Sequence, residues 1–206
     1  MKAMTIPSGM TGVDPDVSMS IGVNTDQSTE DGVLDSDVLV ATKDNQDIII
    51  NKDKINIEFK HLFSKLEVKW ALGNGLQPSD VIINSAVLEN ICINGGFSYS
   101  TTSFDNNITK MMGSVSMLVN TSENILEAII FPYAPTVNPR LVVNATIRGL
   151  KKILACTIVP KSADGFAAGN RYMMIATVNS DDISISSVGI SSGWDTNTED
   201  TDFDTL

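Results

Sequence analysis

The sequence predicts an all-β protein, a mostly antiparallel β-sandwich, from three observations. Helical periodicity is nearly absent from the 206 residues. Short β-branched runs bounded by Gly, Asn, Asp and Pro recur about every 8–12 residues, which is typical of sandwiches and barrels. The alternation of polar and apolar residues between Ile55 and Trp70 has the period of a strand with one buried face. With 42% hydrophobic residues, a chain of this length can build its own core.

The predicted strands follow one another along nearly the whole chain, with boundaries set by turn residues. They cover residues 17–23, 37–41, 47–50, 54–61, 65–72, 85–93, 114–119, 125–131, 140–147, 151–158, 171–178 and 182–188. Residues 73–75, 148–150 and 179–181 carry tight-turn chemistry, so each predicts a local antiparallel pair. The polar stretches 94–113 and 120–124 predict longer surface connections, where a binding function would be expected.

The stretch from Ile55 to Trp70 also predicts a bend. Residues 54–60 are apolar at odd positions, whereas residues 65–70 are apolar at even positions. A continuous strand would turn its apolar face to water where this parity changes. The sequence therefore predicts a bulge or bend at residues 61–64, of the kind found where a long strand passes from one sheet of a sandwich to the other.

The charge and hydropathy of the chain exclude some classes of partner. The net charge of −11 comes from 25 acidic and 14 basic residues, and it argues against nucleic acid and anionic membranes, which bind cationic surfaces. The sequence has no run of 18 apolar residues, so it predicts no membrane-spanning helix. Residues 1–13 lack the features of a secretion signal, so the chain is expected either to be intracellular or to begin after an export signal. Cys92 and Cys156 are expected to be buried thiols, with a single disulfide as the alternative.

Composition divides the chain into three parts. Residues 1–36 are rich in turn residues around one predicted strand, so they are expected to be the remnant of an N-terminal domain or an arm. Residues 37–194 hold the other predicted strands and form the predicted sandwich domain. Residues 195–206 carry five carboxylates and no base, which predicts a mobile acidic tail.

Candidate catalytic and metal-binding residues are scarce. His61 is the only histidine, and no hydrolase elbow or zinc-binding histidine pair can be built around it. It is interpreted as a structural or surface residue rather than a general base or metal ligand. Gly73 and Gly75 lack the third glycine and the helix of a phosphate-binding loop. We therefore expect no catalytic residue, no metal site, no cofactor and no enzymatic activity.

A group of aromatic residues is the best candidate for a ligand-binding site. Phe97, Tyr99 and Phe104 fall in the predicted surface connection 94–113, and aromatic rings displayed on loops offer large contact surfaces. Our hypothesis is that these residues and the loop 136–138 form a binding site for host or microbial glycans or proteins.

The predicted bend carries a resemblance to a known family. Residues 59–68, Phe-Lys-His-Leu-Phe-Ser-Lys-Leu-Glu-Val, resemble the Phe-x-His-x-x-Ser-Lys-Leu-x-Val core of fimbrillin-like proteins of Bacteroides-type bacteria. Residues 26–29 and 36–41 are similar to that family's approach to its C-terminal domain. Further similarity to the family's closing strands, in order, lies in residues 128–132, 166–172, 190 and 194–195. The resemblance depends on this order and spacing rather than on any one motif.

The resemblance implies a transthyretin-like β-sandwich with Greek-key connections, exported and displayed at the outer membrane as a fimbrial subunit. Members are usually lipoproteins with two such domains, and this chain resembles the C-terminal domain plus the last strand of the first. Family subunits polymerise by strand exchange: a protease removes an N-terminal strand, and a neighbour's strand fills the groove. This sequence has no lipobox cysteine, no signal peptide and no Arg before Arg140, so the processing site is expected outside it.

These observations give two main hypotheses for function. The first is a structural subunit of a fimbrium or pilus at the cell surface, which acts in adhesion and whose partners are other pilus subunits or copies of itself. The alternative is a surface β-sandwich that binds glycans or host ligands. An enzyme is the least favoured class.

Overall fold

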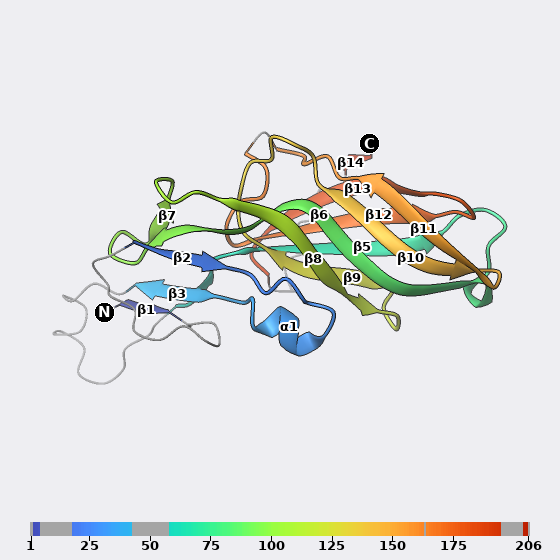
Figure 1. Ribbon diagram of the computed structural model, residues 1–206, viewed down its shortest axis with the longest axis horizontal. Helices are drawn as coiled ribbons and strands as arrows, with labels where there is room; N and C mark the ends of the chain where they lie inside the picture. Colours follow the sequence, from blue (N-terminus) through green and yellow to red (C-terminus); the bar gives the residue numbers. More distant parts are fainter. Residues whose placement is uncertain (1, 5–17, 43–57, 163, 195–203, 206) are drawn as a thin grey trace.

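The structure is a computed structural model that describes residues 2–4, 18–42, 58–162, 164–194 and 204–205. Strands dominate it (Figure 1), and the described helices are the short α1 (Glu30–Leu34) and the 3₁₀ turn η1 (Pro78–Asp80). The prediction of an all-β protein is therefore confirmed. Within the described ranges, no helix has the length and apolar character needed to cross a membrane.

The strands form a small sheet and a large sheet (Figure 1). In chain order they are β1 (Lys2–Met4), β2 (Ser18–Gly22), β3 (Leu39–Thr42), β4 (Lys60–His61), β5 (Ser64–Leu72), β6 (Val81–Ser98), β7 (Ser103–Asp105), β8 (Met111–Asn120), β9 (Ile125–Ile130), β10 (Arg140–Ile147), β11 (Leu150–Thr157), β12 (Asn170–Val178), β13 (Ile183–Ser192) and β14 (Asp204–Thr205). The small sheet has the order β1-β3-β4. The large sheet has the order β11-β10-β6-β8-β9-β5-β12-β13-β14, with β2 and β7 attached to β6. Because β5 and β12 run parallel, the large sheet is mixed.

The large sheet curls so that its two halves enclose one core (Figure 1). One half contains β11, β10, β6 and β8, and the other contains β9, β5, β12 and β13. Alternate residues are buried on β10, for example Leu141 and Val143, and on β12, for example Tyr172 and Met174. Each such side chain contributes about 1.5–3 kcal/mol when it leaves water. The apolar residues whose alternation predicted these strands thus form the buried face that holds the two halves together.

Two of the three predicted tight turns are confirmed. Arg148 and Gly149 have φ of 49° and 78°, the left-handed values that a two-residue hairpin of type I′ requires, and Ile147 pairs with Leu150 across them. Residues 179–181 likewise join the antiparallel pair β12–β13.

The hairpin predicted at residues 73–75 is wrong. Strand β5 pairs with β9 and β12, whereas β6 pairs with β10 and β8. The physical reason is that residues 73–80, which include η1, carry the chain from one half of the large sheet to the other instead of reversing it within one half.

The surface connection predicted at residues 94–113 is shorter than expected. Strand β6 continues to Ser98, because β2 and β7 both pair with its last residues. Gly95 lies here against the ring of Phe131, where an added Cβ would come within 2.5 Å of the ring. Gly95 therefore serves close packing within a strand. The predicted strand 47–50 and the first half of 54–61, residues 54–57, lie outside the described residues.

The predicted bend at residues 61–64 is present. Strand β4 belongs to the small sheet and β5 to the large one, so the chain changes sheets between them. Leu62 and Phe63 are adjacent and both buried, which the strict alternation of a continuous strand does not allow. The Leu62 amide donates to the carbonyl of Val38 at 2.8 Å, which ties the bend to the chain before β3.

The three-part division of the chain stays a prediction. In the first part, β2 adds to the large sheet beside β6, and its Ile21 is fully buried in the common core. Most of the predicted acidic tail lies outside the described residues, and its β14 pairs with β13.

Candidate functional site

The bend brings together three segments that are far apart in the sequence. The Nδ1 atom of His61 lies 2.7 Å from a carboxylate oxygen of Asp37, which follows α1. The imidazole ring stacks on the indole ring of Trp194, with centroids 3.8 Å apart and planes 10° apart. His61 therefore links the N-terminal approach to the end of β13, a structural use of the only histidine.

A second junction fills a split in the large sheet. Strands β8 and β9 pair only through Leu118–Asn120 and Ile125–Glu127, and then diverge. Residues 25–27 lie in the gap: the Ser116 amide donates to the Thr25 carbonyl at 2.9 Å, and the Gln27 amide donates to the Ser116 carbonyl at 3.0 Å. The segment thus pairs with β8 as a short additional strand would.

The side chain of Gln27 completes this junction on the β9 side. It is fully buried. Its Oε1 accepts from the Ile129 amide at 2.7 Å, and its Nε2 donates to the Ile129 carbonyl at 2.8 Å and to the Asn24 carbonyl at 2.9 Å. One side-chain amide therefore bonds β9 as a neighbouring strand's peptide group would. Sequence reasoning did not identify this residue.

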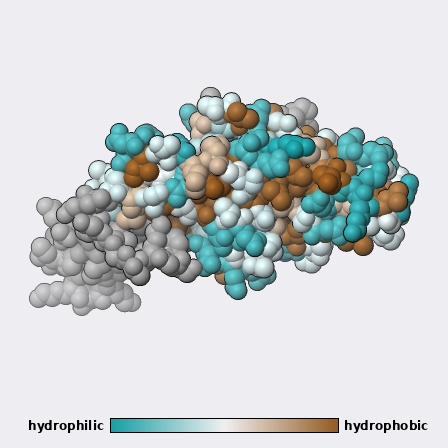
Figure 2. All heavy atoms as spheres, in the orientation of Figure 1, coloured by the Kyte–Doolittle hydropathy of each residue, from teal (hydrophilic) through white to brown (hydrophobic). Residues whose placement is uncertain are grey.

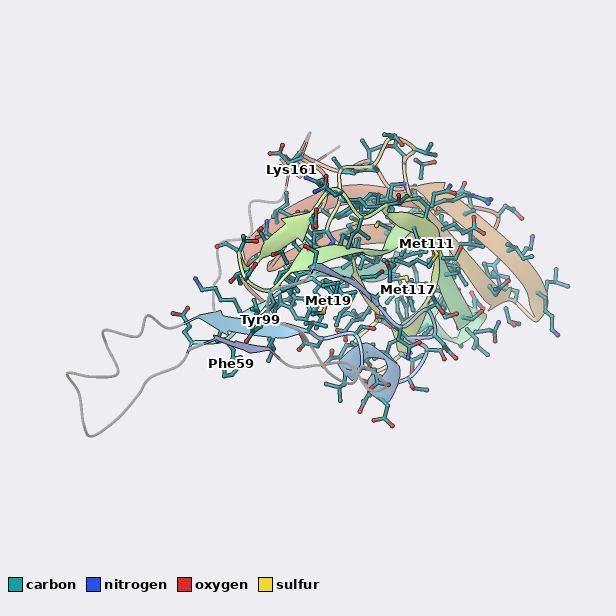
Figure 3. The ribbon with its side chains drawn as sticks, turned by 60° about the vertical axis from the view of Figure 1, so that its left-hand side comes forward. Met19, Phe59, Tyr99, Met111, Met117 and Lys161 are labelled. Atoms are coloured by element: carbon teal, nitrogen blue, oxygen red, sulfur yellow. The ribbon has the colours of Figure 1, made fainter. Side chains whose placement is uncertain are left out.

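The predicted ligand-binding aromatic residues lie at the same end of the molecule as the small sheet. Phe97 is fully buried, and its ring packs edge-on against Phe104, which in turn packs edge-on against Phe131. Tyr99 is half-buried, and Figure 3 shows it at the same end as the exposed Phe59. Phe97 therefore belongs to the core, while a ligand-binding role for Tyr99 and Phe104 stays a prediction.

A charged row lies on the outer face of the second half of the sheet. Lys65 Nζ is 2.8 Å from a carboxylate oxygen of Glu127 and 3.1 Å from Glu67, and Arg171 lies 2.6 Å from the other oxygen of Glu67. Burial opposes the charge of Lys65, but its bonds and attraction to Glu127 and Glu67 outweigh that effect and raise its pKa. These four groups neutralise each other, an arrangement that favours a structural role.

Among the recesses between described residues, two adjoin strand β5. One of about 470 Å³ lies between β5, η1, the start of β6 and the β8–β9 turn, and is lined by Trp70, Pro78, Ile82 and Asn124 among others. Trp70 is only 8% exposed, so its ring belongs to the core as much as to the recess. The other, of about 330 Å³, lies over the charged row beside Met173.

Both cysteines are free thiols. Cys92 is fully buried, and burial raises the pKa of its thiol. Cys156 is half-buried, and burial raises its pKa to about 11. Both thiols therefore remain protonated at neutral pH. Among the described residues, no group of three or more His, Cys, Asp or Glu side chains is arranged to hold a metal ion.

The fold is similar to solved structures from Bacteroides. A proposed cell adhesion protein of Bacteroides uniformis superposes with a TM-score of 0.69 and 18% identity, over 93% of this chain and 71% of that one. A proposed cell adhesion protein of Bacteroides ovatus superposes with a TM-score of 0.64 and 15% identity, over 95% and 68%. At such identities the likeness concerns the fold alone.

Comparison of the sequence with curated proteins finds no match. Comparison with protein families finds a match to the fimbrillin-like family over residues 6–194, which is most of the chain and includes both junctions described above. The chain therefore belongs to the fimbrillin-like family.

Proposed function

We propose that the protein is a structural, non-catalytic subunit of a surface fimbrium that acts in adhesion. The family match over residues 6–194 carries this proposal, and the two similar structures of proposed cell adhesion proteins support it. Its partners are other fimbrial subunits or copies of itself, and its location is the cell surface at the outer membrane. The side-chain networks at the bend and at the split serve packing, which suits a load-carrying subunit.

The finer form of the proposal concerns topology and assembly. The sandwich has the transthyretin-like Greek-key topology of the family, and subunits join by strand exchange. Strand β2 is the candidate for exchange, because it pairs only with the last residues of β6, from Asn94 to Ser98. Its Ile21 fills a fully buried position. Main-chain bonds plus one deep anchor are the features of strand addition in trans.

Cysteine trapping tests this exchange directly. Ser18 and Ser98 are register partners in the β2–β6 pair, so Ser18→Cys in one chain and Ser98→Cys in another bond only when β2 of the first lies on β6 of the second. Both variants are made in a background in which Cys92 and Cys156 are replaced by Ala. Exchange predicts a covalent heterodimer on oxidation of the mixture, and a ladder of multimers from the double variant.

Strand exchange and the fimbrial proposal can fail separately. A double variant that forms only the intramolecular disulfide, at concentrations where fibres assemble, would rule out exchange of β2. The fimbrial proposal itself would fail if antibodies to this chain labelled no fibres or surface structures on the cells that express it.

A ligand-binding role is the second proposal. Tyr99 favours it, because this aromatic side chain is half-buried at the loop end of the molecule (Figure 3). The sharper test compares Tyr99→Ala with Val137→Ala, a change at an exposed position in the other loop considered. Saturable binding on a glycan array that only one of the two variants weakens would locate the site, whereas no binding on broad arrays would end this proposal.

A further inference from the structure

Strand β11 forms an open edge of the large sheet. It pairs with β10 along its whole length, from Leu150 to Thr157. None of the described strands pairs with its other side, although β13 lies near β11. An eight-residue edge with regular geometry presents a row of main-chain donors and acceptors to any strand of matching length. Short strands and bulges are among the devices that protect sheet edges from pairing, and the register of β11 with β10 has no interruption.

The hairpin determines which main-chain groups point away from β10. Ile147 and Leu150 flank a two-residue turn and so form a hydrogen-bonded pair. In an antiparallel ladder such pairs alternate, so the even-numbered residues of β11 bond β10. The Ile158 amide, which donates to the Pro139 carbonyl at 2.8 Å, agrees with this parity. The amide and carbonyl groups of Lys151, Ile153 and Ala155 therefore point outward from the sheet.

The side chains of β11 leave its centre apolar. Ile153 is 74% exposed and lies at the middle of the strand. Figure 2 shows apolar side chains gathered on this face of the molecule, over β6, β10 and β11. The two charged residues, Lys151 and Lys152, lie near the start of the strand. A lysine at the centre would guard the edge against pairing, and this edge has isoleucine there.

We propose that β11 pairs with β11 of a second copy, antiparallel about a two-fold axis at Ile153, so that two large sheets become continuous. In this register Ile153 faces Ile153 of the second copy, and Lys151 faces Ala155 of the second copy. These residues have outward main-chain groups, so each facing pair exchanges two hydrogen bonds. A two-fold axis makes every contact occur twice, which is the commonest symmetry of homodimers.

Charge disfavours the neighbouring register whose axis lies at Lys152. An axis at Lys152 would place the two copies of that lysine directly opposite each other, which is destabilising. With the axis at Ile153, Lys152 faces Leu154 of the second copy. Lys152 also bonds Asp181 of its own chain, so its charge is already compensated. The self-pairing thus brings no like charges into direct opposition along the strand.

This contact is lateral and lies apart from the β2 site of the proposed strand exchange. Strand β2 adds beside the far end of β6, from Asn94 to Ser98, while β11 lies across β10 from the other end of β6. A fimbrial chain could therefore use both contacts at once, one along a fibre and one between fibres. The lateral contact does not depend on the fimbrial proposal.

A charge exchange at the axis tests the proposal with the full chain. Ile153→Lys and Ile153→Glu should each weaken self-association about tenfold, because each places like charges opposite one another at the axis. An equimolar mixture of the two variants should restore the dimer, since opposite charges then meet. The measurement is analytical ultracentrifugation up to about 1 mM chain, the range of weak but specific pairing.

Matched variants keep the outcome decisive. Ile82→Lys changes another exposed isoleucine of the same half of the sheet, away from the edge, and should leave the dimer unchanged. Circular dichroism checks that each variant is folded, which we expect since Ile153 is exposed. A wild-type chain that stays monomeric throughout the concentration range, or a mixture no more dimeric than either variant alone, would overturn the proposal. The Ser18–Ser98 crosslink, tested in the same variants, reports strand exchange independently.

Discussion

The split between β8 and β9 and the outer edge of β11 can be compared, because at each of them the main chain of a strand in the large sheet lacks a paired neighbouring strand. At the split between β8 and β9, residues 25–27 and the side chain of Gln27 occupy the gap and bond both strands. At the outer edge of β11, no described strand pairs with the outward main-chain groups, although β13 lies near β11.

The difference follows from where the unpaired groups lie. The Ile129 amide and carbonyl at the split are shut off from water, since Ile129 and Gln27 are both fully or almost fully buried. An unpaired buried peptide group costs free energy, so the chain must satisfy it internally. The outward groups of β11 can bond water in the isolated chain and exchange that water for a partner strand. The chain must therefore supply its own hydrogen-bond partners at the split between β8 and β9, but it need not do so at the outer edge of β11.

The largest expected effect is at the filled split. Gln27→Leu keeps the volume roughly constant but leaves the Ile129 amide, the Ile129 carbonyl and the Asn24 carbonyl without their side-chain partner. Each unsatisfied buried group costs about 1–3 kcal/mol. We expect the free energy of unfolding to fall by about 3 kcal/mol or more, measured by urea denaturation.

Two further variants define the cause. Ser28→Ala changes the next residue, whose hydroxyl bonds the exposed Asp26, and should shift the free energy of unfolding by less than about 0.5 kcal/mol. Gln27→Glu can still accept from the Ile129 amide but cannot donate to either carbonyl when ionised. If Gln27→Leu lowers the free energy of unfolding no more than Ser28→Ala does, the bonds of Gln27 at the split between β8 and β9 are not needed for stability.

A smaller loss is expected at the bend, where the link is only partly shielded from water. His61→Ala removes both the bond to Asp37 and the stacking on Trp194, and should cost about 1–2 kcal/mol. His61→Phe keeps a ring for stacking and loses only the bond. Amide hydrogen exchange at residues 36–39 should accelerate in both variants, and unchanged exchange there would contradict a linking role for His61.

The regular strands could be predicted from the sequence because each buries one face. The alternation in residues 140–147 gave β10 with the observed bounds. The turn at Arg148 and Gly149 was predictable because a type I′ hairpin is a property of neighbouring residues. The pairing of β5 was not predictable, because the turn chemistry of residues 73–75 is equally compatible with reversal of the chain and with a crossing to the other half of the large sheet.

The two junctions could not be predicted because their partners are distant in the sequence. Gln27 lies in a polar, turn-rich stretch that normally faces water, and its burial depends on Ile129, 102 residues later. The sequence correctly placed a bend at His61, but the stacking partner Trp194 is at the other end of the chain. Phe97 was placed on a surface connection because residues 94–113 contain polar clusters, whereas β6 continues to Ser98 and Gly95 packs closely against Phe131.

The inner side of β11 should show a pH effect that its outer side lacks. Cys156 shares the face of Leu141, its register partner, and packs against the core. Its pKa rises from 9.0 to about 11 on burial, so the folded chain retains the thiol proton longer than the unfolded chain. Its stabilising effect is complete below pH 9 and is lost as pH rises to about 11. Cys156→Ser should therefore flatten the decline in melting temperature over that window, and an identical decline would show that this thiol ionises freely.

The smallest effect is expected on the outer side of the same strand. Ile153→Thr keeps a β-branched side chain, and therefore the preference for a strand, but removes apolar surface from a residue that is 74% exposed. Since this surface faces water in the isolated chain, the free energy of unfolding of dilute protein should change by less than about 0.5 kcal/mol. The comparison with Gln27 then becomes quantitative: a large loss where the chain fills its own gap, and almost none where the gap is left for a partner. A loss above about 1 kcal/mol would mean that Ile153 already packs against its own chain, and the edge of β11 would then be closed rather than open.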